Sequence, residues 1–153
     1  MKTKIFILAI SIISTNAIAV NHSKHHAHEI RALATAIHHE ARGESLAGKK
    51  AVANVIMNRV KHKEFPNTVN GVISQRGQFQ WYHNKKLRAN SSYTKETEEL
   101  AEAVYRAHRA NSRVDNTKGS IFFSSNGRRP AGRAIHPIRI GNHMFYKLKP
   151  KKT

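Results

Sequence analysis

Glu40 is the side chain of this sequence whose surroundings best suit acid–base chemistry. Apolar residues precede it at helical spacing, at Ile30, Leu33, Ala34 and Ile37. This pattern predicts a helix with one buried stripe, and Glu40 falls on the flank of that stripe, in the last turn before Gly43. Partial burial raises the pKa of a carboxyl group, which is the property that a general acid needs. The alternative is an ordinary helix-edge glutamate that pairs with Arg42 or a lysine.

A second carboxylate that could act with Glu40 is hard to find, because the chain has only 9 acidic residues. Four of them crowd the start of one predicted helix, where they favour its dipole and form a solvated face. Asp115 lies in a turn segment that suits capping. Glu44 is therefore the rival of Glu40. It lies past Gly43 and closer to solvent, where we expect it to orient Arg42 or to bind substrate.

Histidine is frequent near the N-terminus, yet the pattern does not predict a metal site or a cofactor. His38 and His39 are adjacent, whereas a two-histidine zinc helix needs them four residues apart. A polar stretch at residues 20–28 carries further histidines at His22, His25, His26 and His28. Their spacing matches no tight site, so a flexible leader is the prediction. The chain has no cysteine, which excludes thiolate ligands and disulfides.

Two further helices are predicted to support Glu40. The first begins at the N-cap residue Ser45 and runs over residues 45–60, and the next begins at the N-cap residue Thr94. Asn58 and Arg59 close the first of these helices. Arg59 is either a cation favoured near a helix C-terminus or, together with Asn58, a brace for the Glu40 turn.

The stretch of residues 75–82 has no periodicity and predicts a loop rich in aromatic and amide side chains. Such side chains are common in sugar-binding grooves, because ring faces pack on sugar C–H surfaces and amides bind hydroxyl and N-acetyl groups. Gln78, Phe79 and Trp81 are the candidates here. Trp81 is equally well explained as a core anchor beneath the loop.

The C-terminal third predicts a small antiparallel sheet. One strand is expected at residues 120–124, followed by a turn at Asn126–Gly127, a basic loop over residues 128–139, and a second strand at residues 140–146. His143 and Tyr146 on the second strand are either substrate contacts or core residues. The predicted fold is α+β: a helical majority with a small antiparallel sheet that closes one side of a groove.

The chain has 153 residues and a formal net charge of +18, which implies an anionic partner. Residues 1–19 have the pattern of a secretory signal, with a basic start, a short apolar run and Ala17-Ile18-Ala19 as the cleavage site. The apolar run is too short for an ordinary membrane span. We expect an exported protein, cut after Ala19, that works in the periplasm or outside the cell. An uncleaved anchor is the alternative.

Several segments, in this order and at these spacings, resemble the SleB-type cell-wall hydrolases, the spore-cortex-lytic family. They are Glu40 with Ala41-Arg42-Gly43-Glu44, Ala51-Val52-Ala53-Asn54-Val55, Asn58-Arg59-Val60, Phe65-Pro66-Asn67-Thr68, Gly71-Val72-Ile73, Gln78-Phe79, Gly119-Ser120-Ile121-Phe122-Phe123 and Ile140-Gly141-Asn142-His143-Met144-Phe145-Tyr146. The resemblance covers about residues 30–148. Ser45, Gln80 and Ser124 depart from what is common in that family.

The resemblance implies a catalytic domain at residues 29–148 with a lysozyme- or transglycosylase-like groove, followed by a basic tail at residues 149–153. It implies cleavage of peptidoglycan between N-acetylmuramic acid and N-acetylglucosamine, with Glu40 as the catalytic acid. The expected substrate contacts are Glu44, Asn58, Gln78, Phe79, Trp81, His143 and Tyr146.

Because a second carboxylate is scarce, we expect a lytic transglycosylase that uses Glu40 alone and leaves 1,6-anhydro ends. A muramidase that uses Glu40, Glu44 and water is the alternative, since glycosidases commonly pair two carboxylates. A non-catalytic basic protein that binds wall or nucleic acid is the other. The expected partners are peptidoglycan strands and anionic envelope polymers, with no specific nucleic acid, no membrane span after cleavage, and a monomeric state.

Overall fold

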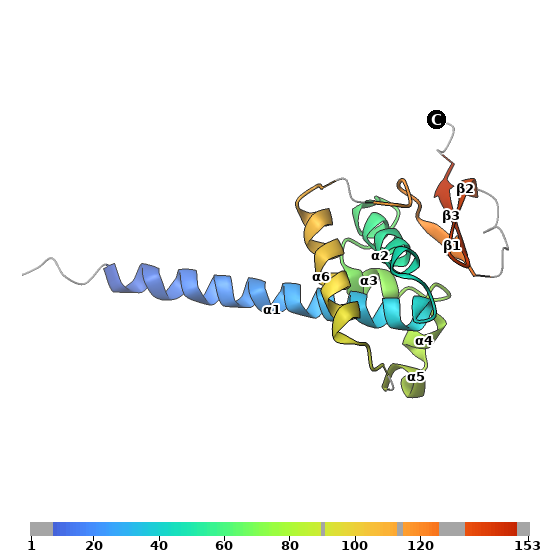
Figure 1. The fold of residues 1–153 in the computed structure, drawn as a ribbon. Helices are drawn as coiled ribbons and strands as arrows, with labels where there is room; N and C mark the ends of the chain where they lie inside the picture. The colour runs from blue at the N-terminus through green and yellow to red at the C-terminus, as the bar shows by residue number, and fades with distance from the viewer. Residues whose placement is uncertain (1–7, 90, 113–114, 126–133, 150–153) are drawn as a thin grey trace, which may run out of the picture.

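The computed structural model describes residues 8–89, 91–112, 115–125 and 134–149. Within these residues, six helices precede a three-stranded antiparallel sheet (Figure 1). The helices are α1 (Leu8–Ala41), α2 (Leu46–Lys61), α3 (Val69–Ile73), α4 (Gln80–His83), α5 (Lys85–Ala89) and α6 (Lys95–Arg109), and the strands are β1 (Phe122–Ser124), β2 (Ala134–Ile140) and β3 (His143–Leu148). The prediction of a mainly helical α+β fold with a small antiparallel sheet is confirmed.

The core lies where α1 crosses α2, α3 and α6. Leu33, Ala34 and Ile37 of the predicted α1 stripe are fully buried. They belong to the same cluster as Val52 and Ile56 of α2. Each buried aliphatic side chain of this size stabilises the fold by roughly 1.5–3 kcal/mol. The second half of α1 is therefore the central element of the helical layer, and it ends at the turn that carries Glu40.

Side chains define where the helices start. Ser45 Oγ accepts a hydrogen bond from the Gly48 N–H at 3.4 Å, and Thr94 Oγ1 accepts one from the Thr97 N–H at 3.2 Å. Both predicted N-caps are confirmed. The start of α3 has an additional partner from outside its own segment, because Glu29 Oε2 of α1 accepts from the Val69 N–H at 2.6 Å. A buried carboxylate at a helix N-terminus is favoured by the helix dipole, and here it joins α1 to α3.

The sheet has the order β1-β3-β2, and β2 was not expected. The sequence pattern predicted a basic loop where the structure has β2, and the strand expected at residues 140–146 is β3. An irregularity in register between Ile135 and Ile138 coincides with a positive φ at His136 and with Pro137. A bulge of this kind breaks the period-2 alternation by which a strand is recognised. The predicted turn at residues 126–127, the first part of the basic loop and residues 150–153 lie outside the described residues.

Residues 20–28 are helical and continue α1, whereas a flexible leader was expected. His26 Nδ1 lies 2.6 Å from the Tyr105 hydroxyl of α6, and this hydrogen bond attaches the stretch to the helical layer. The part of α1 before this point projects away from the rest of the molecule (Figure 1). Over the described residues, no helix has the length and apolar content needed to cross a bilayer. Cleavage after Ala19 stays a prediction.

Candidate active site

Glu40 lies in the last turn of α1, and its carboxyl group is half-buried. Its Oε1 accepts a hydrogen bond from the Trp81 indole N–H at 2.9 Å. Burial raises the pKa of Glu40, whereas the Trp81 bond and the nearby charge of Arg59 act in the opposite direction and do not cancel it. The predicted half-buried carboxyl group with raised proton affinity is confirmed. Such a group holds its proton to higher pH than a free glutamate does.

Trp81 positions Glu40 from the short helix α4, which occupies part of the stretch predicted to be a loop. The indole is buried and stacks on the His39 ring, with centroids 4.4 Å apart and planes inclined by 13°. His39 is in turn held by a 2.6 Å hydrogen bond between its Nε2 and Ser91 Oγ. The structure therefore agrees with the explanation of Trp81 as a buried anchor. Its indole N–H points to Glu40.

Phe79 and Gln78 are adjacent in the chain but differ sharply in solvent exposure. Phe79 is 1% exposed and belongs to the core, so the expectation that it contacts substrate is wrong. Its ring lies 5.5 Å from the guanidinium carbon of Arg59. The chain enters α4 immediately after Phe79, which turns Phe79 and Trp81 inward and leaves Gln78 exposed. Gln78 stays available for a substrate contact.

Arg59 is a buried cation beside Glu40, rather than a surface cation at the end of α2. It is 4% exposed, and its Nε donates a 2.7 Å hydrogen bond to the Ile121 carbonyl. Its guanidinium carbon lies 5.4–5.9 Å from the ring centroids of three phenylalanines, Phe65, Phe79 and Phe122. Burial lowers the pKa of Arg59 to about 10, and the charge of Glu40 opposes this shift. Arg59 stays protonated at neutral pH, and its charge acts on Glu40 electrostatically.

Asn58 is occupied elsewhere, so neither its predicted brace on the Glu40 turn nor its predicted substrate contact is correct. Its amide nitrogen lies within hydrogen-bonding distance of Asp115 Oδ2 at 2.9 Å and the Ser120 carbonyl at 2.9 Å. Asp115 also accepts from the backbone N–H groups of Thr117 and Gly119 at 2.8 and 2.7 Å. The expectation that Asp115 has a capping role in a turn is confirmed, and Asn58 joins α2 to that turn.

Glu44 is enclosed by the turn between β2 and β3, rather than lying closer to solvent as expected. Its side chain is 7% exposed, its Oε2 accepts from the Asn142 N–H at 3.1 Å, and its Oε1 lies 3.4 Å from His143 Nδ1. The Asn142 hydrogen bond is the main cause that lowers the pKa of Glu44. The pKa values of the two glutamates are therefore shifted in opposite directions, upward for Glu40 and downward for Glu44.

His143 and Tyr146 are core residues of β3. Both are buried, and the His143 ring lies 5.6 Å from the Phe123 ring, edge to face. Of the two explanations offered for these residues, core packing is the one observed. The role of His143 is to approach Glu44 from the sheet, so it influences the site without an exposed surface of its own.

Gly141 is needed for the Glu44 contact. Its φ is +59°, and a Cβ at this position would overlap Glu44 Oε2. We expect Gly141→Ala to lower the free energy of unfolding at pH 7 by about 1–2 kcal/mol from the left-handed backbone alone, with a further loss as Glu44 is displaced. Gly77→Ala is the matched control, since Gly77 has φ +77° and open space around its Cβ position. Urea unfolding of the two variants measures the difference.

The Gly141 prediction has a pH signature. The folded-state pKa of Glu44 is depressed, so its stabilisation is present above the unfolded pKa and is lost as pH falls through the folded value. The extra destabilisation of Gly141→Ala over Gly77→Ala should therefore shrink on acidification. A difference that stays constant down to acidic pH would contradict the Glu44 assignment.

A hollow of about 540 Å³ shares Trp81 with the Glu40 site. Its lining combines aromatic and polar side chains, among them Thr35, Trp81, Tyr82, Arg88, Ser91 and Tyr93. Ring faces beside hydroxyl and guanidinium groups suit the binding of sugars. A separate cavity of about 740 Å³ lies between α1 and α6, where it shares no residue with the contacts of Glu40. Over the described residues, no three His, Asp or Glu side chains gather as metal ligands.

Residues 43–146, more than half of the chain, match the family described as cell wall hydrolase. The chain belongs to the cell wall hydrolase family. The matched span begins just after Glu40, so it contains Glu44 and the whole of the site from α2 onward. The assignment of Glu40 depends on the geometry described above and is independent of this match.

The fold of this chain is similar to that of two solved structures. The chain is similar to the catalytic domain of the Bacillus cereus SleB protein, with 27% identity and a TM-score of 0.63 over 78% of this chain and 89% of that one. It is also similar to the catalytic domain of the germination-specific lytic transglycosylase SleB from Bacillus anthracis, with 27% identity and a TM-score of 0.62 over 78% and 93%.

Curated relatives match over a shorter segment. The spore cortex-lytic enzymes of Bacillus cereus and Bacillus subtilis are both 53% identical over 45 residues, which is 29% of this chain. The segment spans only 17% and 15% of those two proteins. The family is therefore established, and what the whole protein acts on is a matter for proposal.

Proposed function

We propose that this protein cleaves the glycan strands of peptidoglycan between N-acetylmuramic acid and N-acetylglucosamine, as a lytic transglycosylase with Glu40 as its acid and base. The observation that carries the proposal is the Glu40 carboxyl group, half-buried in the last turn of α1 with a raised pKa and a hydrogen bond from Trp81. Membership of the cell wall hydrolase family supports the substrate class. A similar chain described as a germination-specific lytic transglycosylase supports the reaction type.

Trp81 gives the two oxygens of Glu40 different roles. Oε1 accepts the indole N–H, so in the neutral acid Oε1 is the carbonyl oxygen and Oε2 carries the proton. When Oε2 gives up the proton, the charge of Arg59 and the Trp81 bond stabilise the carboxylate that forms, since both lower the pKa of Glu40. Burial favours the acid form and these two contacts favour the base form. A residue that must act first as acid and then as base needs this balance.

The reaction follows from these roles. Glu40 protonates the glycosidic oxygen, and the bond between that oxygen and C1 of N-acetylmuramic acid breaks. The C6 hydroxyl of the same sugar then bonds to C1 and closes the anhydro ring, and its proton returns to the Glu40 carboxylate. No water is consumed, and Glu40 ends in its starting state.

The contacts of Glu44 favour this route over hydrolysis. A muramidase would need a second carboxylate with a free oxygen for water. Glu44 is ionised, but its Oε2 is bonded to the Asn142 N–H, its Oε1 faces His143, and its side chain is nearly buried. Glu44 is thus better suited to hold the β2–β3 turn against the end of α1 than to activate water.

Mass spectrometry of the muropeptides released from purified cell walls tests the proposal. We expect ends that carry 1,6-anhydro-N-acetylmuramic acid. Reducing muramic ends would support the muramidase with Glu40 and Glu44 instead. Intact walls after incubation, with the protein bound to them, would support the non-catalytic wall binder.

The charge of the protein suggests its other partners. The formal net charge of +18 becomes +16 when Lys2 and Lys4 are removed with the signal, and a charge of this size draws a protein to anionic polymers over a range that salt shortens. Peptidoglycan stems carry carboxylates and envelope polymers carry phosphates, so we propose that an exported monomer concentrates at the cell wall by this attraction.

Trp81→Phe should shift the pH dependence of wall lysis. The indole N–H lowers the pKa of Glu40, so its removal should raise that pKa further. Glu40 would then keep its proton to higher pH, and the alkaline limb of the pH–rate profile should move to higher pH. Tyr82→Phe is the control, because it alters a neighbouring ring without touching the hydrogen bond to Glu40. Equal alkaline limbs in Trp81→Phe and the parent would contradict the role given to the indole.

A further inference from the structure

The segment Val20-Asn21-His22 has no role in the site around Glu40, and it contains a histidine two residues after Val20. Cleavage after Ala19 would make Val20 the first residue and His22 the third. We propose that export in this way creates a binding site for Cu(II), formed by the Val20 amine, the backbone nitrogens of Asn21 and His22, and the His22 imidazole Nδ1. This site is separate from the glycan site and does not depend on the reaction proposed for Glu40.

The spacing is what makes the site specific. A histidine at the third position closes three fused chelate rings, so that these nitrogens lie in one plane around one ion. Square-planar nitrogen coordination suits Cu(II) and Ni(II), and Cu(II) stands highest in affinity among the divalent first-row metals. Binding releases the amide protons of Asn21 and His22, together with any proton on the amine or the imidazole. The copper stays Cu(II), so no oxidant or reductant is needed.

The structure leaves this stretch free to rearrange. Val20 is 53% exposed, and Asn21 and His22 are exposed beside it on the projecting part of α1 (Figure 1). After a cut, the first N–H groups of the shortened helix would have no carbonyl acceptor, so they are available to a metal. The hydrogen bond between His26 and Tyr105 holds α1 to α6 beyond this point. Residues 20–22 can therefore leave the helix without loss of that contact.

His26 offers an additional ligand. Its Nδ1 is engaged by the Tyr105 hydroxyl, and its Nε2 lies 3.2 Å from His22 Nδ1. When residues 20–22 leave the helix, the His22 contact is broken and His26 Nε2 becomes available, four residues along the chain. A second imidazole above or below the plane is compatible with the tetragonal geometry of Cu(II).

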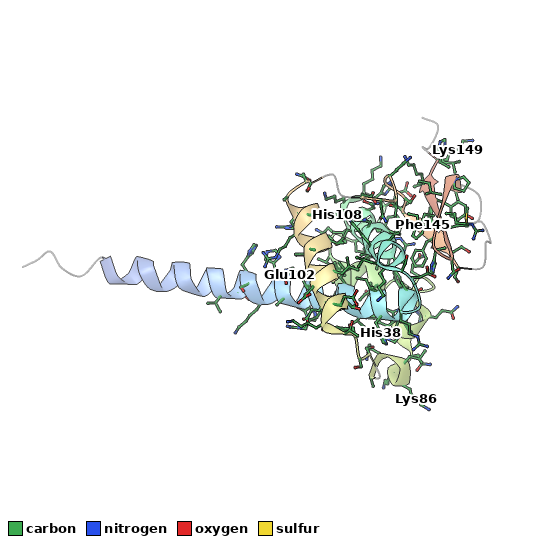
Figure 2. The ribbon with its side chains drawn as sticks, viewed as in Figure 1. His38, Lys86, Glu102, His108, Phe145 and Lys149 are labelled. Carbon is green, nitrogen blue, oxygen red and sulfur yellow. The ribbon has the colours of Figure 1, made fainter. Side chains whose placement is uncertain are left out.

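A site built from imidazoles and a carboxylate is less well supported. Glu102 lines the same cavity as His22 and His26, and Figure 2 shows it on α6 where α1 enters the helical layer. Its Oε1 is paired with Arg106, at 2.6 Å from Nη2. The carboxylate is therefore engaged, and the terminal amine and backbone nitrogens are the better ligands.

The test uses the full chain, exported by a bacterial host and purified from outside the cytoplasm. Mass spectrometry of the intact protein should identify Val20 as its first residue. Titration with CuCl₂ should then produce the visible d–d absorption band of planar nitrogen-coordinated Cu(II), which saturates at one copper per chain. A mature chain that begins at any other residue would overturn the proposal.

Matched substitutions separate this site from simple histidine binding. Asn21→Pro keeps every imidazole but removes an N–H whose nitrogen must bind the metal, so the band should be lost. Asn21→Ala keeps that N–H and should retain the band, whereas His22→Ala should lose it. If Asn21→Pro binds copper with the parent's spectrum and stoichiometry, the ligands are imidazoles alone and the proposal is wrong.

Discussion

Glu40→Gln should reduce the rate of wall lysis by about 10²–10⁴-fold, the usual contribution of a general acid. Glutamine has nearly the same shape, and its carbonyl oxygen can still accept the Trp81 indole N–H. It has no proton to give to the glycosidic oxygen. The fold and the affinity for walls should be unchanged, which thermal unfolding and a wall-sedimentation assay can measure beside the turbidity assay of lysis.

Glu44→Gln is the matched control, since it makes the same chemical change four residues further on, just past the end of α1. Its carbonyl oxygen can still accept from the Asn142 N–H, so the turn should stay in place. If Glu40 acts alone, Glu44→Gln should keep most of the lytic activity. Equal loss of activity in both variants would favour the muramidase, and full activity in Glu40→Gln would remove Glu40 from the mechanism.

Arg59→Met should lower the free energy of unfolding by about 2–4 kcal/mol. The variant loses a hydrogen bond from a charged group to the Ile121 carbonyl, a type of bond that contributes about 1.5–3 kcal/mol. It also loses cation–π contacts with the phenylalanine rings, of which each contributes roughly 0.5–2 kcal/mol. Methionine fills much of the same volume and limits the cavity. Urea unfolding measures the change.

The same substitution should act on Glu40 at a distance. The charge of Arg59 lowers the pKa of Glu40, so Arg59→Met should move the alkaline limb of lysis to higher pH. Arg59→Lys keeps a charge but cannot reproduce the Nε bond, so it should be destabilised with a smaller shift of the limb. An Arg59→Met variant that is destabilised but has an unshifted limb would show that Arg59 is a packing residue only.

The sequence predicts α2, α6 and the buried half of α1 well because their signals are local, whereas α4 lies in a stretch expected to be a loop. Ser45 and Thr94 were identified as N-caps from residue type and position, and the α1 stripe from its periodicity. Strand β2 was missed because Pro137 and the irregular register near it remove the alternation on which strand recognition depends. The helical leader was missed because its support is a tertiary contact between His26 and Tyr105, which residue order does not reveal.

For the site as well, the features set by local sequence were predictable and those set by tertiary contacts were not. Glu40 was identified because partial burial can be deduced from its place on the helix face. The residues that shift its pKa come from distant segments, and residue order alone does not reveal the distances between them. Asn58 and Phe79 were assigned to the substrate by residue type alone, whereas the structure commits Asn58 to the Asp115 turn and Phe79 to the core. Polar and aromatic types indicate a site only once exposure is known.

The last turn of α1 and the short turn after it join two parts of the molecule through two carboxyl groups. Glu40 is bonded to α4 and Glu44 to the β2–β3 turn, and Figure 2 shows His38 near this end of α1 and Phe145 in the sheet. Glu44 lies past the end of α1, and its backbone N–H donates a 3.0 Å hydrogen bond to the Ala41 carbonyl of the last turn. A displacement of the hairpin is therefore passed on to the acid through the short turn at residues 41–44. Substitutions in that hairpin, far from Glu40 in the sequence, should alter the orientation of the Glu40 carboxyl group as well as the stability of the fold.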